Sequence, residues 1–222
     1  MAHILNIIFD RIYVINLEKD KIKKKNMEEQ LNKLGIKFSF FNAIDGRNSP
    51  YKEIYEKYLN KKLKYEGCHQ LEKSLNKKVL GGYGSLGILK TMEKLFENAM
   101  NNKYKRILTL QDDTIFDNDF NSKIEEYIKD IPNDWKILSL GVSQHMWSKV
   151  NFNKKQKYYK TPYYTDGAFA IGFDHTIFKC ILNEIRKFNC NFDSGPIRSV
   201  YRRYRNRCYT IYPNIVIAKL SN

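Results

Sequence analysis

The chain has 222 residues, a length that fits one α/β domain with a well-filled core better than two domains. Hydrophobic residues make up 42% and charged residues 28%, and this balance excludes disorder as the dominant state. The formal net charge of +15 favours anionic partners, such as nucleotide sugars, nucleic acid or an acidic surface. Much of the lysine excess accompanies Asn, Ile and Tyr, a bias expected from A/T-rich coding, so charge alone does not choose among these partners.

The apolar runs of the chain are no longer than a β-strand and therefore predict no transmembrane segment. Residues 1–10 are briefly apolar but lack a charged leader and a small-residue cleavage site. We therefore expect no secretory signal and a cytoplasmic location. The chain stops soon after a predicted strand, which is compatible with trimming from a longer parent protein.

Strand and helix patterns alternate along the chain. Runs of β-branched residues predict strands, and apolar residues at helical spacing predict helices between them. The predicted strands are residues 11–17, 37–42, 106–110, 135–140, 167–173 and 209–217. The predicted helices are residues 20–34, 51–59, a segment opened by the glycines at 81–84, residues 121–129 and a segment capped by Asp174. The alternation predicts an α/β fold, a mostly parallel sheet with helices on both faces, in which the Lys-rich segment up to residue 79 is an exposed loop bordering a site.

Polar side chains follow three of the predicted strands. Asn16, Asp45 and the pair Asp112-Asp113 all stand at carboxyl ends of strands, where open α/β sheets bind ligands. Two adjacent carboxylates repel each other unless they are solvated or neutralised by a cation. A hard divalent ion suits their oxygen ligands and also holds a diphosphate. The alternative is a solvated turn or an N-cap of the following helix.

Several further segments, in chain order, carry a resemblance to a known family. They are residues 12–17 (ending Asn-Leu), 41–46 (Ala-Ile-Asp-Gly at the end), 81–85 (Gly-Gly-Tyr-Gly-Ser), 108–116 (Leu-Thr-Leu-Gln-Asp-Asp-Thr-Ile-Phe), 134–141, 165–171 and Pro213. Together they resemble glycosyltransferase family 25, whose members include bacterial lipopolysaccharide β-galactosyltransferases and collagen hydroxylysine galactosyltransferases. The resemblance covers most of the chain.

The resemblance implies a single glycosyltransferase domain of the GT-A type, Rossmann-like, over residues 1–222. It implies a metal-dependent, inverting hexosyltransferase that takes galactose or glucose from a UDP-sugar. The acceptor would be a hydroxyl of a glycan or of a protein, such as hydroxylysine. The implied cofactor is Mn²⁺ or Mg²⁺, and nucleic acid is not an expected partner.

The implied donor site uses the polar groups at the strand ends. Asp113, helped by Asp112, would hold the metal ion against the diphosphate. Asn16 and Asp45, with Gly46 and Asp112, would lie where the nucleotide binds.

Two carboxylates are candidates for the base that deprotonates the acceptor hydroxyl. Asp193 is the first, because it lies just before Pro196-Ile197, and Asp166 is the second, because it lies just before Gly167. The alternative for both is a surface or capping carboxylate. His145, near Trp147, is a candidate for the acceptor side of the cleft, with an ordinary surface histidine as the alternative.

The chain departs from the family pattern at three places. Gln111 stands where an acidic residue is usual, Ile88-Leu89 replace a Ser-His, and Arg198 replaces the Asp of a Pro-Ile-Asp pattern. These departures favour a second hypothesis, a catalytically degenerate glycosyltransferase-like module that binds its ligand without turnover.

The run of arginines from Arg198 to Arg207 supports a third hypothesis, a basic nucleic-acid-binding protein. Tyrosines alternate with these arginines, and such a stripe could stack on bases, or could clamp a diphosphate or an acidic acceptor. The alternative is a solvated helix whose tyrosines pack inward. A zinc site has no support, because the four cysteines form no Cys-x-x-Cys pair and the histidines lack ligand spacing.

Overall fold

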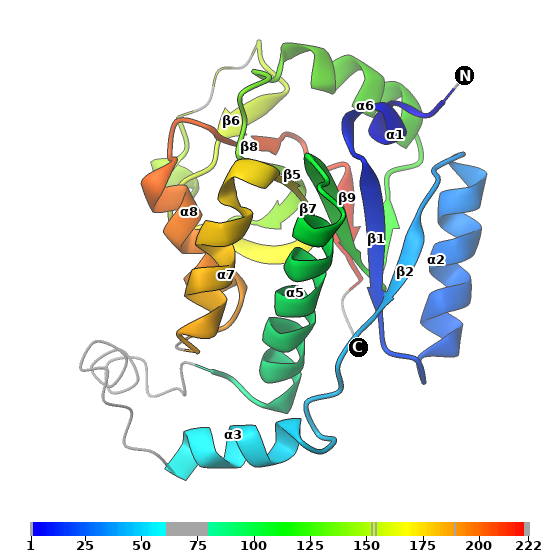
Figure 1. Ribbon diagram of the computed structural model, residues 1–222. Helices are drawn as coiled ribbons and strands as arrows, with labels where there is room; N and C mark the ends of the chain where they lie inside the picture. Colours follow the sequence, from blue (N-terminus) through cyan, green and yellow to red (C-terminus); the bar gives the residue numbers. More distant parts are fainter. Residues whose placement is uncertain (1, 61–79, 152, 154, 189, 220–222) are drawn as a thin grey trace.

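The computed structural model of the protein describes residues 2–60, 80–151, 153, 155–188 and 190–219. In these ranges a seven-stranded sheet has the strand order β2-β1-β3-β7-β5-β8-β6, and β4 pairs with β9 in a separate two-stranded sheet (Figure 1). The strands are β1 (Arg11–Asn16), β2 (Ser39–Asn42), β3 (Arg106–Gln111), β4 (Thr114–Phe116), β5 (Ile137–Ser143), β6 (Tyr158–Lys160), β7 (Asp166–Asp174), β8 (Cys208–Ile211) and β9 (Val216–Ala218).

The helices of the described ranges occupy both faces of the large sheet. They are α1 (Ile4–Ile8), α2 (Lys21–Lys33), α3 (Tyr51–Asn60), α5 (Tyr83–Asn101), α6 (Phe120–Tyr127), α7 (Phe178–Arg186) and α8 (Arg198–Arg203). A π-helical turn over Asp193–Ile197 leads directly into α8. The predicted α/β class, with helices on both faces, is confirmed.

The sheet is mixed. β1 runs parallel to β2 and β3, and β5 runs parallel to β8, whereas β7 is antiparallel to both β3 and β5, and β6 to β8. The carboxyl ends of β1, β2, β3, β5 and β8 therefore meet at one edge, together with the first residues of β7. This edge gathers the polar residues considered below.

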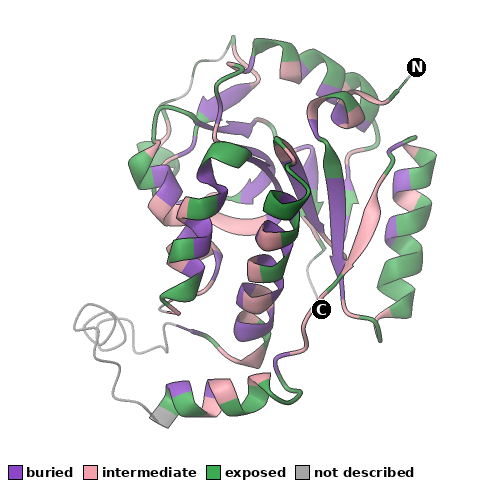
Figure 2. Ribbon diagram, viewed as in Figure 1, coloured by how far each residue is buried: buried purple, intermediate pink, exposed green. Residues whose placement is uncertain are grey.

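Each face of the sheet has its own hydrophobic core. On one face, the apolar sides of α5 and α7 pack on the sheet through residues such as Leu89, Phe96 and Ile181, which are at most 1% exposed. On the other face, Met27 and Leu31 of α2 and Phe120 of α6 are completely buried. Figure 2 shows the central strands buried between these layers, with α2 exposed along its outer side. Apolar side chains repeat at helical spacing on α5 and α7, which is why these segments fold as helices against the sheet.

Two predicted elements end differently in the structure. The single strand predicted for residues 209–217 is two strands, β8 and β9, because the chain turns between them, where Ile215 N–H donates to the Leu140 carbonyl. The helix predicted to carry the arginine run ends at Arg203, so Arg205 and Arg207 lie beyond α8. The loop predicted for the residues up to 79 lies outside the described residues.

The turn after β2 packs against the first turns of α5 without space for a side chain between them. A Cβ atom at Gly87 would lie 2.3 Å from the Ile44 carbonyl oxygen, and one at Gly46 would lie 2.0 Å from the Tyr83 carbonyl oxygen. Both distances are shorter than any van der Waals contact. Glycine at these positions therefore fixes the Asp45 turn against α5.

We expect Gly87→Ala to lower the free energy of unfolding by about 1–3 kcal/mol, because the added methyl group forces the two backbones apart. Gly84→Ala, in the first turn of the same helix, is the matched control, since a Cβ there meets nothing within 4 Å. Helix propensity alone favours Ala over Gly at both positions. Urea denaturation of the two variants measures the difference, and equal stabilities would contradict the close approach.

Candidate functional site

The buried end of β1 lies beside the acidic pair that follows β3. Asn16 is 4% exposed, and its side-chain amide donates to Asp112 Oδ2 over 2.7 Å and to the Asp20 carbonyl over 3.3 Å. The register of the parallel strands, with Ile15 opposite Gln111, brings these residues together. The hydrogen bond from Asn16 therefore fixes the orientation of the Asp112 carboxylate.

A lysine on α2 neutralises the same carboxylate. Lys23 Nζ lies 3.3 Å from Asp112 Oδ1, the oxygen that Asn16 does not contact. Both oxygens of Asp112 thus have a protein donor. Lys23 lies in the first turn of α2, the helix that directly follows β1. Because β1 pairs in parallel with β3, the ammonium group of Lys23 lies near the carboxyl end of β3.

Asp113 is left without such a partner. Its Oδ1 is buried and accepts no hydrogen bond from the described residues. Burial, and then the neighbouring charge of Asp112, raise the pKa of the Asp113 carboxyl above its usual range, and the Lys23 charge opposes this only in part. A buried carboxylate oxygen without a donor is costly, so its presence at a strand end indicates a position that a ligand completes.

The acidic pair fits a divalent cation in its chemistry. Carboxylate oxygens are the ligands that Mn²⁺ and Mg²⁺ prefer, and the uncompensated oxygen of Asp113 is one. The described residues contain no group of three His, Cys, Asp or Glu side chains that could hold a metal ion by themselves.

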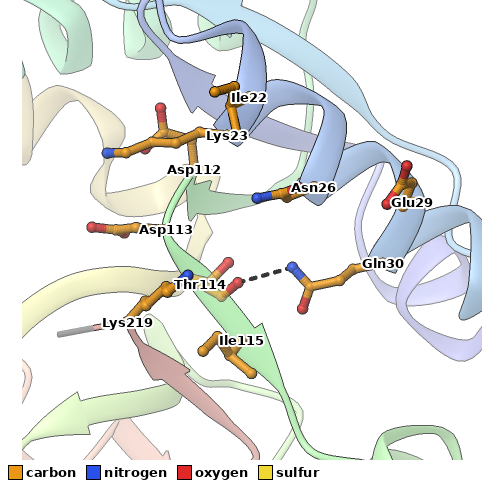
Figure 3. Close-up of a pocket in the computed structure, with 10 residues that line it drawn as sticks. All are labelled: Ile22, Lys23, Asn26, Glu29, Gln30, Asp112, Asp113, Thr114, Ile115 and Lys219. Atoms are coloured by element: carbon orange, nitrogen blue, oxygen red, sulfur yellow. Dashed lines mark hydrogen bonds and ion pairs between the residues drawn. The ribbon is translucent and has the colours of Figure 1, made fainter. Parts of the chain in front are cut away.

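A cavity of about 630 Å³ opens beside this pair, between α2 and β4 (Figure 3). Asp112, Asp113 and Lys23 line it, and Lys219, which follows β9, lines it from the side opposite to α2. Lys219 N–H also donates to the Asp113 carbonyl over 2.7 Å. Three carboxylates, those of Asp112, Asp113 and Glu29, thus share with the two ammonium groups one cavity large enough for part of a nucleotide.

Asp45 lies in a different groove of the same edge. Lys19 Nζ lies 2.7 Å from its Oδ2, and the Arg47 guanidinium forms two hydrogen bonds of 2.7 Å with its oxygens. The Arg47 guanidinium first, and then Lys19, hold the pKa of that carboxyl well below its usual range. Asp45, Lys19 and Asn48 help to line a groove of about 440 Å³, whereas the adjacent Gly46 is buried against α5.

Asp193 lies at a third cavity, on the α5 side of β3. Its Oδ2 accepts a hydrogen bond of 3.4 Å from Gly167 N–H, and its Oδ1 accepts one of 2.7 Å from Ser194 N–H. Together with Gln111, it lines a cavity of about 380 Å³. Gln111 and the acidic pair are consecutive, so the cavities of Asp193 and Asp113 lie on either side of the end of β3.

Asp166 is engaged in an ion pair. Arg198 Nη2 lies 2.5 Å from its Oδ1, and His145 Nε2 lies 4.0 Å from its Oδ2. Arg198, which stands where the Pro-Ile-Asp pattern has its Asp, is therefore the ion-pair partner of Asp166, the second candidate base.

The structure unites some of the predicted site residues and separates others. Asn16, Asp112 and Asp113 form one cluster, while Asp45 and Asp193 line their own cavities. The contributions of Lys23 and Lys219 were missed from the sequence. Lys23 is one of several lysines in a polar helix, and Lys219 reaches the site only through the pairing of β9 with β4. No sequence signal singles them out.

None of the helices in the described ranges combines the length and apolar composition that crossing a membrane requires. Residues 9–184 match the family model described as glycosyltransferase family 25 (LPS biosynthesis protein). No curated protein sequence matches the chain. Among solved structures, the chain is similar to a glycosyltransferase involved in the glycosylation of the major capsid of PBCV-1, with 10% identity, 91% of this chain and 92% of that chain covered, and a TM-score of 0.40.

We expect the two adjacent aspartates to respond oppositely to amidation at neutral pH. Asp113→Asn removes a buried charge that has no donor on Oδ1, so it should stabilise the protein by about 1 kcal/mol, or about 2–4 °C in Tm. Asp112→Asn removes the charge that pairs with Lys23 and replaces one of the two acceptor oxygens with an NH₂ donor, so it should lower Tm. Thermal unfolding of the two variants without ligand measures this, and a loss of stability in both would show that Asp113 is already compensated.

Proposed function

We propose that this chain, which belongs to glycosyltransferase family 25, is a metal-dependent inverting transferase that moves galactose or glucose from a UDP-sugar to a hydroxyl of a glycan or a protein. The observation that carries the proposal is the acidic pair at the end of β3. One of its carboxylates is held by Asn16 and Lys23, and the other has a buried oxygen that receives no hydrogen bond from the described residues.

The donor would occupy the carboxyl edge of the sheet on the α2 side. Lys23 and Lys219 supply positive charge in the cavity of the acidic pair, and a diphosphate carries the complementary charge. The groove of Asp45 and Asn48 beyond β2 offers polar groups to the nucleoside. These two lysines offset part of the repulsion between an anionic donor and the carboxylates of the cavity.

Asp113 and Asp112 would hold Mn²⁺ or Mg²⁺. When bound, such an ion stabilises the negative charge that develops on the departing diphosphate. Gln111 supplies a neutral amide at the neighbouring position, so this chain would contribute fewer charges to the ion than the family pattern does.

The acceptor would approach from the cavity on the other side of β3. Its hydroxyl oxygen forms a bond to the anomeric carbon while the bond from that carbon to the diphosphate oxygen breaks, and UDP leaves with the electron pair. Asp193 would take the hydroxyl proton, since its carboxylate lines this cavity and is oriented by Gly167 N–H and Ser194. Attack from the face opposite the leaving group inverts the configuration at that carbon.

A binding module without turnover is the second candidate. The observation that favours it is the pairing of Asp166 with Arg198, which removes one of the two candidate bases, together with the neutral Gln111. Donor binding would persist in such a module, whereas transfer would not.

We expect UDP and UDP-galactose to raise Tm in the presence of Mn²⁺ and to lose most of this effect in chelator. A ligand at about 100 times its Kd stabilises the folded protein by about 2.7 kcal/mol, which is a readable shift. Asp113→Ala should abolish the Mn²⁺-dependent part, while Asp117→Ala, which removes an aspartate beyond β4, should leave it intact. A thermal-shift panel that includes GDP and CMP measures this, and a parent protein that responds to no nucleotide would overturn the proposed function.

We expect Asp193→Asn to lower kcat for transfer by about 100-fold or more, since a general base contributes that much. Asp166→Asn should lower it by less than about tenfold, because Asp166 is occupied by Arg198. UDP release from UDP-galactose with simple glycosides as acceptors measures the rates. Unchanged nucleotide-induced Tm shifts in both variants are the control, and the reverse order of rates would exchange the two assignments.

A further inference from the structure

Aromatic side chains are exposed on one part of the molecule only, within the described ranges. Among the large hydrophobic side chains that are exposed there, the aromatic ones are Trp147 at 51%, Tyr164 at 47% and Tyr163 at 37%. The others are aliphatic residues or methionine. All three rings lie in the two segments that flank β6, on the side of the molecule where β8 and α8 also lie (Figure 1). We call these rings, with Arg198 and Arg202 of α8, the aromatic–arginine surface.

The rings of this surface are held in place. Trp147 packs at 5.5 Å against Tyr212 and at 6.0 Å against Tyr159, and half of its area still faces solvent. Tyr163 and Tyr164 contact each other edge to face at 5.0 Å. Rings that are exposed and yet fixed lose little conformational entropy when a ligand stacks on them.

The surface also carries positive charge. The guanidinium carbons of Arg198 and Arg202 each lie 6.0 Å from the centroid of the Tyr163 ring. Arg198 is neutralised by Asp166, but Arg202 is exposed and forms no ion pair with any carboxylate of the described residues. Cation–π contact orients the Arg202 side chain over Tyr163 and leaves its donors available to an anion.

The segments that carry the aromatic–arginine surface lead directly into residues that line the cavity of Asp193. Ser143 is paired with Asp166 at the edge of the sheet, and Gln144 Nε2 donates to Thr165 Oγ1 over 2.8 Å, so the segment leading to Trp147 lies against the segment of Tyr164. Asp166 is followed by Gly167, whose N–H contacts Asp193. The π-helical turn that begins at Asp193 ends where α8 begins with Arg198.

We propose that the aromatic–arginine surface is the acceptor subsite, and that it binds a saccharide carrying an anionic substituent. The apolar C–H face of a pyranose ring would pack on Trp147 and Tyr164, since aromatic faces bind such surfaces, and a carboxylate or phosphate of the saccharide would pair with Arg202. This inference rests on the proposed function, because a subsite for an acceptor requires a transferase. It adds the class of acceptor, an acidic glycan.

The test is direct saccharide binding by the full chain at 0.15 M salt, measured by saturation-transfer-difference NMR and titration. The probes are methyl β-D-glucoside, methyl β-D-glucuronide and glucose 6-phosphate, so that the neutral ring, a carboxylate and a phosphate are compared. We expect either acidic probe to bind at least about threefold more tightly than the neutral one. Trp147→Ala should weaken both acidic probes by about tenfold, and Arg202→Ala should remove the preference for charge while retaining the neutral probe.

Met100→Ala and Lys179→Ala are the matched controls, because they remove an exposed apolar side chain and an exposed charge from α5 and α7. Both should bind all three probes as the parent does. Equal binding of acidic and neutral probes, no binding, or loss in the control variants would overturn the proposal, as would tighter binding of a single-stranded oligonucleotide than of the saccharides. The Mn²⁺-dependent Tm shift with UDP is recorded on the same samples: its presence without saccharide binding rejects this subsite alone, and its absence in the parent rejects the proposed function instead.

Discussion

The repulsion between the adjacent carboxylates of Asp112 and Asp113 is the constraint on which the arrangement of the edge depends. Two like charges at the end of a buried strand need compensation. The fold supplies it unequally, because Asn16 and Lys23 satisfy both oxygens of Asp112, whereas one buried oxygen of Asp113 has no donor in the part of the chain that the structure describes. Each compensating group comes from the β1–α2 unit, so the parallel pairing of β1 with β3 positions the charges of the site as well as the sheet.

Most of the fold follows from patterns that are local in the sequence. The apolar stripe of α5, the β-branched run of β1 and the cap at Asp174, whose side chain accepts from Thr176 N–H, are each visible within about ten residues. The two-strand ending of the chain is different. The apolar residues of 209–217 predict one strand, although Pro213 and Asn214 within them are turn residues, and β8 and β9 belong to different sheets. The pairing of β9 with the distant β4 has no local signal, because it depends on tertiary structure.

In the candidate site, too, some features follow from the local sequence and others depend on tertiary structure. Position at strand ends predicts that Asn16, Asp45, Asp112 and Asp113 reach one edge, and the structure places them there. Which of these residues touch each other could not be predicted, because it depends on side-chain reach. Lys19 and Arg47 form ion pairs with Asp45. Lys23, four residues beyond Lys19, forms its ion pair with Asp112 instead. Gly46 is predicted among the nucleotide-binding residues, and the structure shows its tight contact with the Tyr83 backbone, a packing requirement that a sequence pattern does not distinguish from ligand contact.

The departures from the family pattern become interpretable once the two sides of β3 are considered together. Arg198 replaces a carboxylate, and its guanidinium pairs with Asp166, so this replacement exchanges one candidate base for a neutral ion pair. Within the described part of the chain, the oxygens of Asp193 accept from the N–H and O–H groups of Gly167 and Ser194 and contact no cation. A general base needs an oxygen that the acceptor hydroxyl can reach, and Arg198 occupies one oxygen of Asp166. Arg198 also lies beside Tyr163, where Arg202 adds a charge that Asp166 does not neutralise. The departure at Arg198 thus leaves one carboxylate fewer at the proposed transfer position, and the positive charge beside it comes from Arg202. Both features are consistent with an acceptor that is itself acidic.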